Sequence, residues 1–151
     1  MVTWKIKDMF FDRAKIRRAA GKAKLKVLGK AGAKVRRIAR SSMRKRKGPA
    51  PPGQPPHVHK GTLKRLLLFG YDRVHDTVLV GSVGLGKAEA PGLQEFGGKA
   101  KRVRPVRPNR GGNRRRQKVT VVVKRRPYMR PALEKVAPEL PLLWRGAVKE
   151  G

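Results

Sequence analysis

The chain has 151 residues, with 40 Lys and Arg against nine Asp and Glu, so its formal net charge is +31. Self-repulsion destabilises a compact state with this much like charge, and an anionic partner is therefore expected, with nucleic acid first among the candidates. Cysteine is absent, which excludes disulfides, thiolate zinc sites and cysteine nucleophiles. No run of 18 apolar residues occurs, and charges at Lys5, Lys7 and Asp8 oppose a signal peptide, so we expect a non-secreted protein without membrane attachment.

Apolar residues at spacings of three and four predict one long basic helix from Asp12 to about Ser42, through Ile16, Ala20, Ala23, Val27, Ala31, Val35 and Ile38. Asp12 stands where an N-cap belongs. Gly21, Gly29 and Gly32 each cost a helix about 1 kcal/mol relative to Ala, so a partner surface must hold this segment. The small residues of the apolar stripe suit close approach of another backbone, as in a bundle of copies around an axis.

The next segment, Gly48 to Pro56 (GPAPPGQPP), predicts an extended and fairly stiff linker, because proline removes backbone donors and fixes φ. We therefore divide the chain into a basic N-terminal helix at 1–47, a Pro-rich linker at 48–59 and a small α+β domain at 60–151.

Two segments after the linker have the apolar and β-branched residues of strands, Gly61–Phe69 and Thr77–Val83, although GTLKRLLL could also open as a helical turn. Tyr71–Asp76 would form the hairpin connection between them. Pro91–Phe96 is a short element whose type the sequence leaves open.

Lys99–Lys118 is a Pro/Gly/Arg tract without apolar periodicity, which predicts a long basic loop that is disordered until bound. Val119–Val123 reads as a strand, and Pro131 to about Val136 begins a final helix with proline at an early position. Pro138 and Pro141 interrupt that helix. The expected fold class is α+β, with a long basic N-terminal helix, a small antiparallel sheet, a short C-terminal helix and the long basic loop.

Catalysis and metal binding find little support. Asp72 and Asp76 straddle a turn, and turn chemistry is the simpler explanation for a carboxylate pair at that spacing. His57 and His59 fall on one side of an extended segment, but a third metal ligand is missing nearby. The sequence predicts no enzyme activity, no metal site and no cofactor.

The basic tracts are the strongest physical signal, because flexible or solvent-facing Lys and Arg neutralise phosphates without reading bases. A solvated charge run is a poorer explanation, since solubility is served by mixed signs. Aromatic residues make up 5% of the chain and do not interleave with the basic tracts, so base stacking is not indicated. The candidate contacts to double-stranded DNA are Arg36, Arg37, Arg40, Arg44, Lys45, Arg46, Lys47, Arg102, Arg104, Arg107, Arg110, Arg114, Arg115 and Arg116.

Four pieces of the chain, in this order, resemble the head-tail joining (neck or tail-completion) protein family of long-tailed bacteriophages. They are APPGQPPHVHKGTLKRLL (Ala50–Leu67), VLVGSVGL (Val78–Leu85), APGLQEFGG (Ala90–Gly98) and RRPYMRPALEKV (Arg125–Val136). The last two are the most specific, because family members are similar in a Glu-Phe-Gly segment and an aromatic-Met/Leu-Arg-Pro-Ala-Leu helix start. The chain departs from the family where Gly92 and Leu93 replace an aromatic-Ala pair and Gly98 replaces a common Thr.

The resemblance implies a non-enzymatic virion component of the phage neck, made in the host bacterial cytoplasm. It further implies a homo-oligomeric ring around the DNA channel, six-fold by analogy, with other neck and tail proteins as neighbours. The motif residues assigned to assembly and core are Gly61, Leu63, Glu95, Phe96, Gly97, Tyr128, Met129, Arg130, Pro131 and Leu133.

Physical roles follow for several of these residues. Phe96 is expected to anchor in the core while Gly97 and Gly98 reverse the chain with positive φ. Leu133 should continue the buried face of the final helix. Glu95 and Arg130 are opposite charges that could pair within or between subunits.

The alternative is a cellular, sequence-independent nucleic-acid-binding protein of ribosomal or nucleoid type. Composition alone favours this alternative, whereas the order of the four pieces opposes it. The sequence contains no helix-turn-helix, zinc-finger or RNP pattern.

Overall fold

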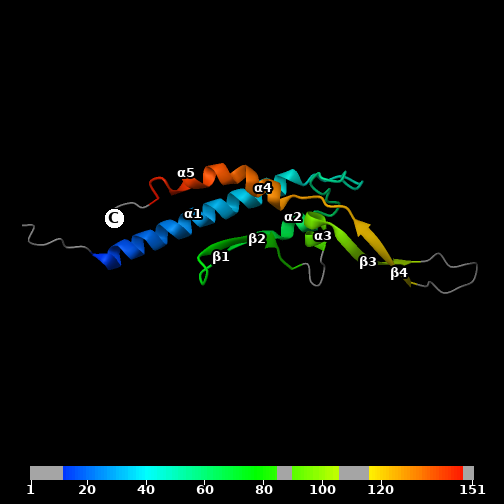
Figure 1. Cartoon of the computed structure of the whole chain (residues 1–151), viewed down its shortest axis with the longest axis horizontal. Helices are drawn as coiled ribbons and strands as arrows, with labels where there is room; N and C mark the ends of the chain where they lie inside the picture. The colour runs from blue at the N-terminus through cyan, green and yellow to red at the C-terminus, as the bar shows by residue number, and fades with distance from the viewer. Residues whose placement is uncertain (1–11, 85–89, 106–115, 148–151) are drawn as a thin grey trace, which may run out of the picture.

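The computed structural model describes residues 12–84, 90–105 and 116–147. Its elements confirm the expected α+β class (Figure 1). In chain order they are α1 (Arg13–Ser42), α2 (Thr62–Leu66), β1 (Leu67–Asp72), β2 (Thr77–Ser82), α3 (Ala90–Phe96), β3 (Gly98–Pro105), β4 (Arg116–Val123), α4 (Met129–Val136), a 3₁₀ turn (Ala137–Glu139) and α5 (Leu140–Trp144). The strands form two separate antiparallel hairpins, β1–β2 and β3–β4.

The long helix α1 begins and ends as the sequence predicts. The carboxylate of Asp12 accepts a hydrogen bond from the backbone N–H of Lys15 at 2.9 Å, which satisfies one of the unpaired donors of the first turn. The helix ends at Ser42, after which Met43 is extended and fully buried. Its buried residues are Ala23, Val27, Gly32, Val35 and Ala39. Three of them belong to the predicted stripe, whereas Ile16 and Ala20 of that stripe are exposed and Gly32 and Ala39 lie outside it.

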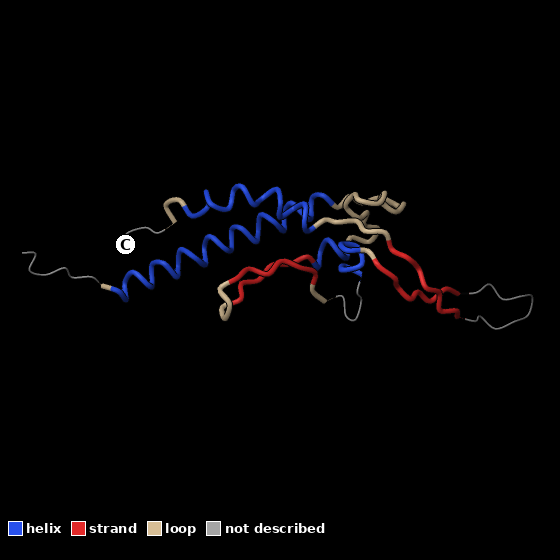
Figure 2. The backbone as a smooth tube through the Cα atoms, in the orientation of Figure 1, coloured by secondary structure: helices blue, strands red, loops and turns tan. Residues whose placement is uncertain are grey.

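Other parts of the same chain cover both sides of α1. The β1–β2 hairpin packs along one side and α4 and α5 along the other, as Figures 1 and 2 show. A Cβ atom at Gly32 would lie 2.5 Å from Cγ1 of Val78 and 3.0 Å from Cδ2 of Phe69, so glycine is what lets the hairpin come this close. This close contact is made by side chains of the same chain at Gly32, a residue outside the predicted stripe, and the bundle of copies around an axis stays a prediction.

The hydrophobic core lies where the C-terminal half of α1, the linker, the start of β1 and α4 meet. Its buried members are Val35, Ala39, Met43, Val58, Leu67, Tyr128, Ala132 and Val136. The Nε–H of Arg36 donates to the carbonyl of Leu67 at 2.6 Å and adds a polar tie between α1 and β1.

The linker has no helix or strand between Gly48 and Pro56, as proline content predicts. It is nevertheless packed against the rest of the chain, since Ala50, Pro56 and Val58 are buried.

The prediction of a loop over 99–118 is wrong at both ends. Residues 99–105 belong to β3 and residues 116–118 to β4, with Lys99 opposite Val122 and Arg104 opposite Gln117. Strand β3 forms because its backbone hydrogen-bonds to β4, which does not require apolar residues to alternate along β3. The sequence pattern of β3 therefore did not indicate a strand. The hairpin projects from the body in Figure 1, and residues 106–115 of the predicted loop lie outside the described residues.

Several shorter predictions are resolved by the structure. The segment beginning at Gly61 opens with the helical turn α2 before entering β1, and Pro91–Phe96 belongs to the helix α3. Pro138 ends the regular α4 in a 3₁₀ turn, and Pro141 lies in the first turn of α5. Among the described helices, none is both long and apolar enough to cross a membrane.

Candidate nucleic-acid interface

Helix α1 has twelve Lys and Arg and no acidic residue. Six of these cations are spaced by seven, four, four, seven and three residues, which places them along one side of a helix with 3.6 residues per turn. We call these six the basic stripe, and they are Lys15, Lys22, Lys26, Lys30, Arg37 and Arg40. All are exposed except Arg40, which is half-buried.

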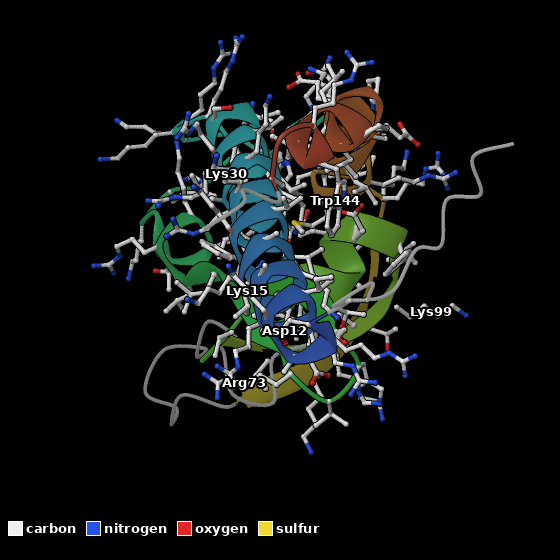
Figure 3. All side chains as sticks on the ribbon, turned by 90° about the vertical axis from the view of Figure 1, so that its left-hand side faces the viewer. Asp12, Lys15, Lys30, Arg73, Lys99 and Trp144 are labelled. Carbon is white, nitrogen blue, oxygen red and sulfur yellow. The ribbon has the colours of Figure 1, made fainter. Side chains whose placement is uncertain are left out.

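The basic stripe borders the packed surface of α1, since Lys15, Lys22 and Lys26 line a hollow with the buried Ala23 and with Ala147. Figure 3, which looks at the N-terminal end of α1, shows Lys15 and Lys30 on one side of the helix and Trp144 of α5 on the other. At a rise of 1.5 Å per residue the stripe is about 38 Å long, close to the roughly 34–36 Å of one turn of B-DNA. A rigid helix therefore presents a row of cations on the length scale of a duplex turn.

Other cations of α1 hold the fold together. Lys24 forms an ion pair with Asp76 in the β1–β2 turn, and Lys34 forms one with Glu139 before α5. The hydrogen bond from Lys24, followed by one from the hydroxyl of Tyr71, keeps the pKa of Asp76 below its ordinary value of 3.8. Lys24 and Lys34 therefore stabilise the packing of other elements on α1, and neither belongs to the basic stripe.

Apart from Asp12, which caps α1 at the backbone N–H of Lys15, the described carboxylates have partners on other residues than those of the stripe. Asp72 accepts hydrogen bonds from the ring of His75 and the N–H of Val74, which lower its pKa in that order. Glu134 pairs with Arg130 at 3.0 Å. Among the described residues, no ion pair joins a carboxylate to a side chain of the stripe. The positive potential of the stripe is therefore not offset by ion pairs within this part of the chain.

The predicted DNA contacts divide into four groups. Arg36 and Arg40 are half-buried on α1, and the Nε–H of Arg36 already donates to the carbonyl of Leu67. Arg37, Arg44, Lys45, Arg46 and Lys47 are exposed at the C-terminal end of α1 and just beyond it. For the second basic tract, the structure describes only some of the predicted contacts. Arg102 is exposed on β3, and Arg104 and Arg116 belong to the paired strands, with their side chains outside the described set. The remaining predicted contacts lie outside the described residues and are Arg107, Arg110, Arg114 and Arg115.

The motif residue Glu95 caps helix α4. Its Oε2 accepts hydrogen bonds from the backbone N–H groups of Tyr128 and Met129, at 2.9 and 3.1 Å, and its Oε1 accepts from the N–H of Arg130 at 2.9 Å. The next residue, Pro131, has no N–H. The donors that the first turn of a helix leaves unpaired are thus all satisfied or absent, and the negative charge sits at the positive end of the helix dipole.

Glycine is required at the turn that follows Glu95. Gly97 has φ 77° and Gly98 has φ 142°, as the sequence predicts. A Cβ at Gly97 would lie 3.1 Å from the carbonyl oxygen of Val123, so the turn also needs glycine for close packing. Gly61 similarly adopts φ 71° at the start of α2. Leu63 of α2 is half-buried against the core.

The prediction that Phe96 anchors in the core is wrong, because its side chain is 81% exposed. Glu95 faces the N-terminus of α4, and the next residue of a helix points about 100° away from it, which turns Phe96 outward. Leu133 does not continue the buried face either, since it is 51% exposed. Of the motif aromatics only Tyr128 is buried, and this burial raises the pKa of its hydroxyl.

Glu95 and Arg130 interact, although not as a pair of side chains. The carboxylate of Glu95 accepts a hydrogen bond from the backbone N–H of Arg130, while the guanidinium of Arg130 forms an ion pair with Glu134 one turn later.

Phe96 and Leu133 border an apolar groove of about 580 Å³ between α1, β2, α3 and α4. Its other apolar lining residues include Leu28, Val35, Val78, Val80, Met129 and Leu140. Further large apolar side chains, Leu142 and Trp144, are exposed on α5. These surfaces have the character of a contact region for another protein chain.

Sequence reasoning missed the four N-terminal cations of the stripe, although their spacing contained the signal. It also missed Lys135, which the fold brings beside Arg44 and Arg46 from the far end of the chain. Comparisons of the chain with protein-family models, curated proteins and solved structures found no match.

Proposed function

We propose that this chain is a structural, non-enzymatic protein that binds double-stranded DNA without sequence preference and serves as a ring subunit of a phage neck. The observation that carries the DNA-binding part is the division of α1 into a packed side and a basic stripe. Cations fixed on a rigid surface contact a phosphate backbone with less loss of conformational freedom than cations on a flexible arm.

The unpartnered apolar surfaces support the oligomeric part of the proposal. The groove beside Phe96 and the exposed residues of α5 offer two patches on different elements, which suits the head-to-tail contacts of a ring. The β3–β4 hairpin adds a third surface, because Val119, Val121 and Val123 share one half-buried face with Ala100. A lone two-stranded hairpin is marginal in water, so a neighbouring subunit would stabilise it.

The neck assignment itself comes from the resemblance of the four motif pieces. The two most specific pieces meet where Glu95 accepts hydrogen bonds from the start of α4, which gives each piece a structural role in this chain. On this proposal the protein is made in the host cytoplasm and assembles with other neck and tail proteins, six copies to a ring.

A ribosomal or nucleoid-type protein remains the second candidate, because a projecting basic hairpin would also suit RNA. Native mass spectrometry separates the two proposals. A neck subunit should give one closed stoichiometry, whereas the alternative predicts monomers that bind RNA at least as tightly as DNA. Genes for a portal, capsid or tail tube beside the encoding gene would also favour the neck.

The DNA-binding proposal is tested by fluorescence anisotropy with two unrelated duplexes over a range of salt concentrations. Lys22→Gln, Lys26→Gln and Lys30→Gln together should weaken both complexes equally and flatten the salt dependence, by a slope of about 0.9 for each lost phosphate contact.

The matched control removes three charges from the projecting hairpin, at Lys99, Lys101 and Lys118, all of which are exposed. It should weaken binding less than the stripe variant does. A strong preference for one duplex, or an equal loss in the two variants, would contradict the proposal.

A further inference from the structure

We propose that a hollow at the C-terminal end of α1 is a binding site for one phosphate group of a nucleic-acid strand. The hollow has a volume of about 380 Å³ and is lined by the cations Arg44, Arg46 and Lys135, together with His57. We call it the phosphate pocket. Its assignment to nucleic acid rests on the proposed function, whereas its affinity for phosphate follows from its own residues.

The polar side chains of the phosphate pocket converge from three separate segments, two of which supply its cations. Arg44 and Arg46 follow α1, His57 belongs to the linker, and Lys135 belongs to α4. None of the residues that line the pocket is acidic, and Ile38 and Pro55 add apolar wall. A concave surface with one sign of charge and apolar walls concentrates the potential inside it. A merely solvated run of charge would not need Lys135 to join from a distant part of the sequence.

The pocket is also held in shape before any ligand arrives. The N–H of Val58 donates to the carbonyl of Arg44 at 3.0 Å, and the Nε–H of Arg126 donates to the carbonyl of Ala50 at 2.7 Å. Both bonds fasten the Pro-rich linker, whose prolines already restrict its backbone. A preorganised site loses less conformational entropy on binding.

The hydrogen bond of His57 decides which ring nitrogen is available. Its Nδ1 lies 2.9 Å from the carbonyl oxygen of Gly48. A carbonyl only accepts, so Nδ1 has the proton and donates. In this tautomer Nε2 is an acceptor, so His57 shapes the wall of the pocket, and Arg44, Arg46 and Lys135 are the donors for phosphate oxygens.

The lining chemistry matches an anion such as a phosphate rather than a metal ion. Arginine forms paired hydrogen bonds to two phosphate oxygens, and lysine adds a compact point charge. The volume lies at the lower end of the roughly 300–1,000 Å³ range of small-ligand sites, which suits one nucleotide unit of a strand. The phosphate belongs either to the interior of a strand or to its 5′ end.

The site is tested by calorimetric titration of the full chain with inorganic pyrophosphate. The wild type should bind it saturably at one site, and Arg46→Gln with Lys135→Gln should weaken binding about tenfold or more, which is about 1.4 kcal/mol. Lys99→Gln with Lys101→Gln removes the same charge from exposed positions on β3 and should change binding less than about twofold. Both pocket side chains are exposed, so thermal unfolding should be unchanged.

Two duplexes of one sequence, with 5′-phosphate or 5′-hydroxyl ends, identify the source of the phosphate. A preference for the phosphorylated ends that disappears in the pocket variant assigns the strand end. Equal binding of both duplexes, with the same loss in the pocket variant, assigns an internal phosphate.

Unsaturable pyrophosphate binding, or an equal loss in the pocket and β3 variants, would overturn the phosphate pocket even if duplexes bind as proposed. Saturable pyrophosphate binding without any duplex binding would instead refute the proposed function, and with it the nucleic-acid source of the phosphate.

Discussion

The carboxylate of Glu95 in α3 accepts a hydrogen bond from the backbone N–H of Arg130 in α4, with 2.9 Å between Oε1 and the nitrogen. Together with the bonds to Tyr128 and Met129, this contact makes a residue outside α4 its N-terminal cap. The side chain of Tyr128 itself makes no capping bond. One side chain therefore links α3 to the start of α4.

We predict that Glu95→Ala lowers the free energy of unfolding by about 2–3 kcal/mol, because it leaves three backbone donors without their charged acceptor. Glu95→Gln keeps one acceptor oxygen and should lose about half as much. Urea unfolding followed by circular dichroism measures both changes. Glu134→Gln is the control, since it removes an exposed ion pair with Arg130 worth less than about 0.5 kcal/mol. Equal midpoints for Glu95→Ala and the control would contradict the capping role.

A second prediction concerns two glycines of α1 that differ only in their surroundings. Gly29 has no atom within 4 Å of the position of an added Cβ, so Gly29→Ala should stabilise the chain by about 0.5–1 kcal/mol. Gly32→Ala gains the same helix propensity but forces a methyl group against the stiff side chain of Val78, a contact that typically costs about 1–3 kcal/mol. Thermal unfolding should therefore shift in opposite directions. A stabilised Gly32→Ala would show that the hairpin does not pack closely on α1.

The sequence predicts the elements well where local chemistry decides them. Asp12 caps α1, the stripe residues Ala23, Val27 and Val35 are buried, and Gly97 has the positive φ that its place after Phe96 suggests. Strand β3 escaped prediction because its pairing depends on β4 and not on its own pattern.

The candidate site was less accessible to sequence reasoning. The exposure of Phe96 depends on the direction in which α3 presents Glu95, and that direction is fixed by α4, a distant partner in the sequence. Lys135 joins Arg44 and Arg46 only through the packing of α4 on α1. Local sequence patterns show which residues are charged, but not which of them the fold brings close together.

A third prediction follows from the lowered pKa of Asp76, whose first cause is its hydrogen bond from Lys24. Because the folded-state pKa lies below the unfolded value, the pair contributes its full stability above the unfolded pKa. This contribution is lost as the pH falls through the lowered folded-state pKa. Asp76→Asn keeps a residue that tolerates the φ of 54° but has no charge to lose.

The difference in urea midpoint between wild type and Asp76→Asn should therefore shrink as the pH is lowered from about 6 to about 2.5. Wild-type protein should be the more stable of the two at the upper pH. A difference that stays constant over this range would mean that the ion pair does not link the hairpin to α1.

The last prediction separates the stability of one chain from its assembly. Phe96 is 81% exposed, so Phe96→Ala should change the free energy of unfolding by less than about 0.5 kcal/mol. Leu67 is fully buried in the core, and Leu67→Ala should cost about 2–5 kcal/mol, a large part of the stability of a small domain. If the groove beside Phe96 is a subunit contact, Phe96→Ala should instead reduce self-association, which sedimentation velocity measures with and without duplex DNA to neutralise the repulsion between copies. Leu133→Ser, on the same groove, should act in the same direction. A Phe96→Ala protein that unfolds as easily as Leu67→Ala, or that assembles like wild type, would remove Phe96 from the proposed interface.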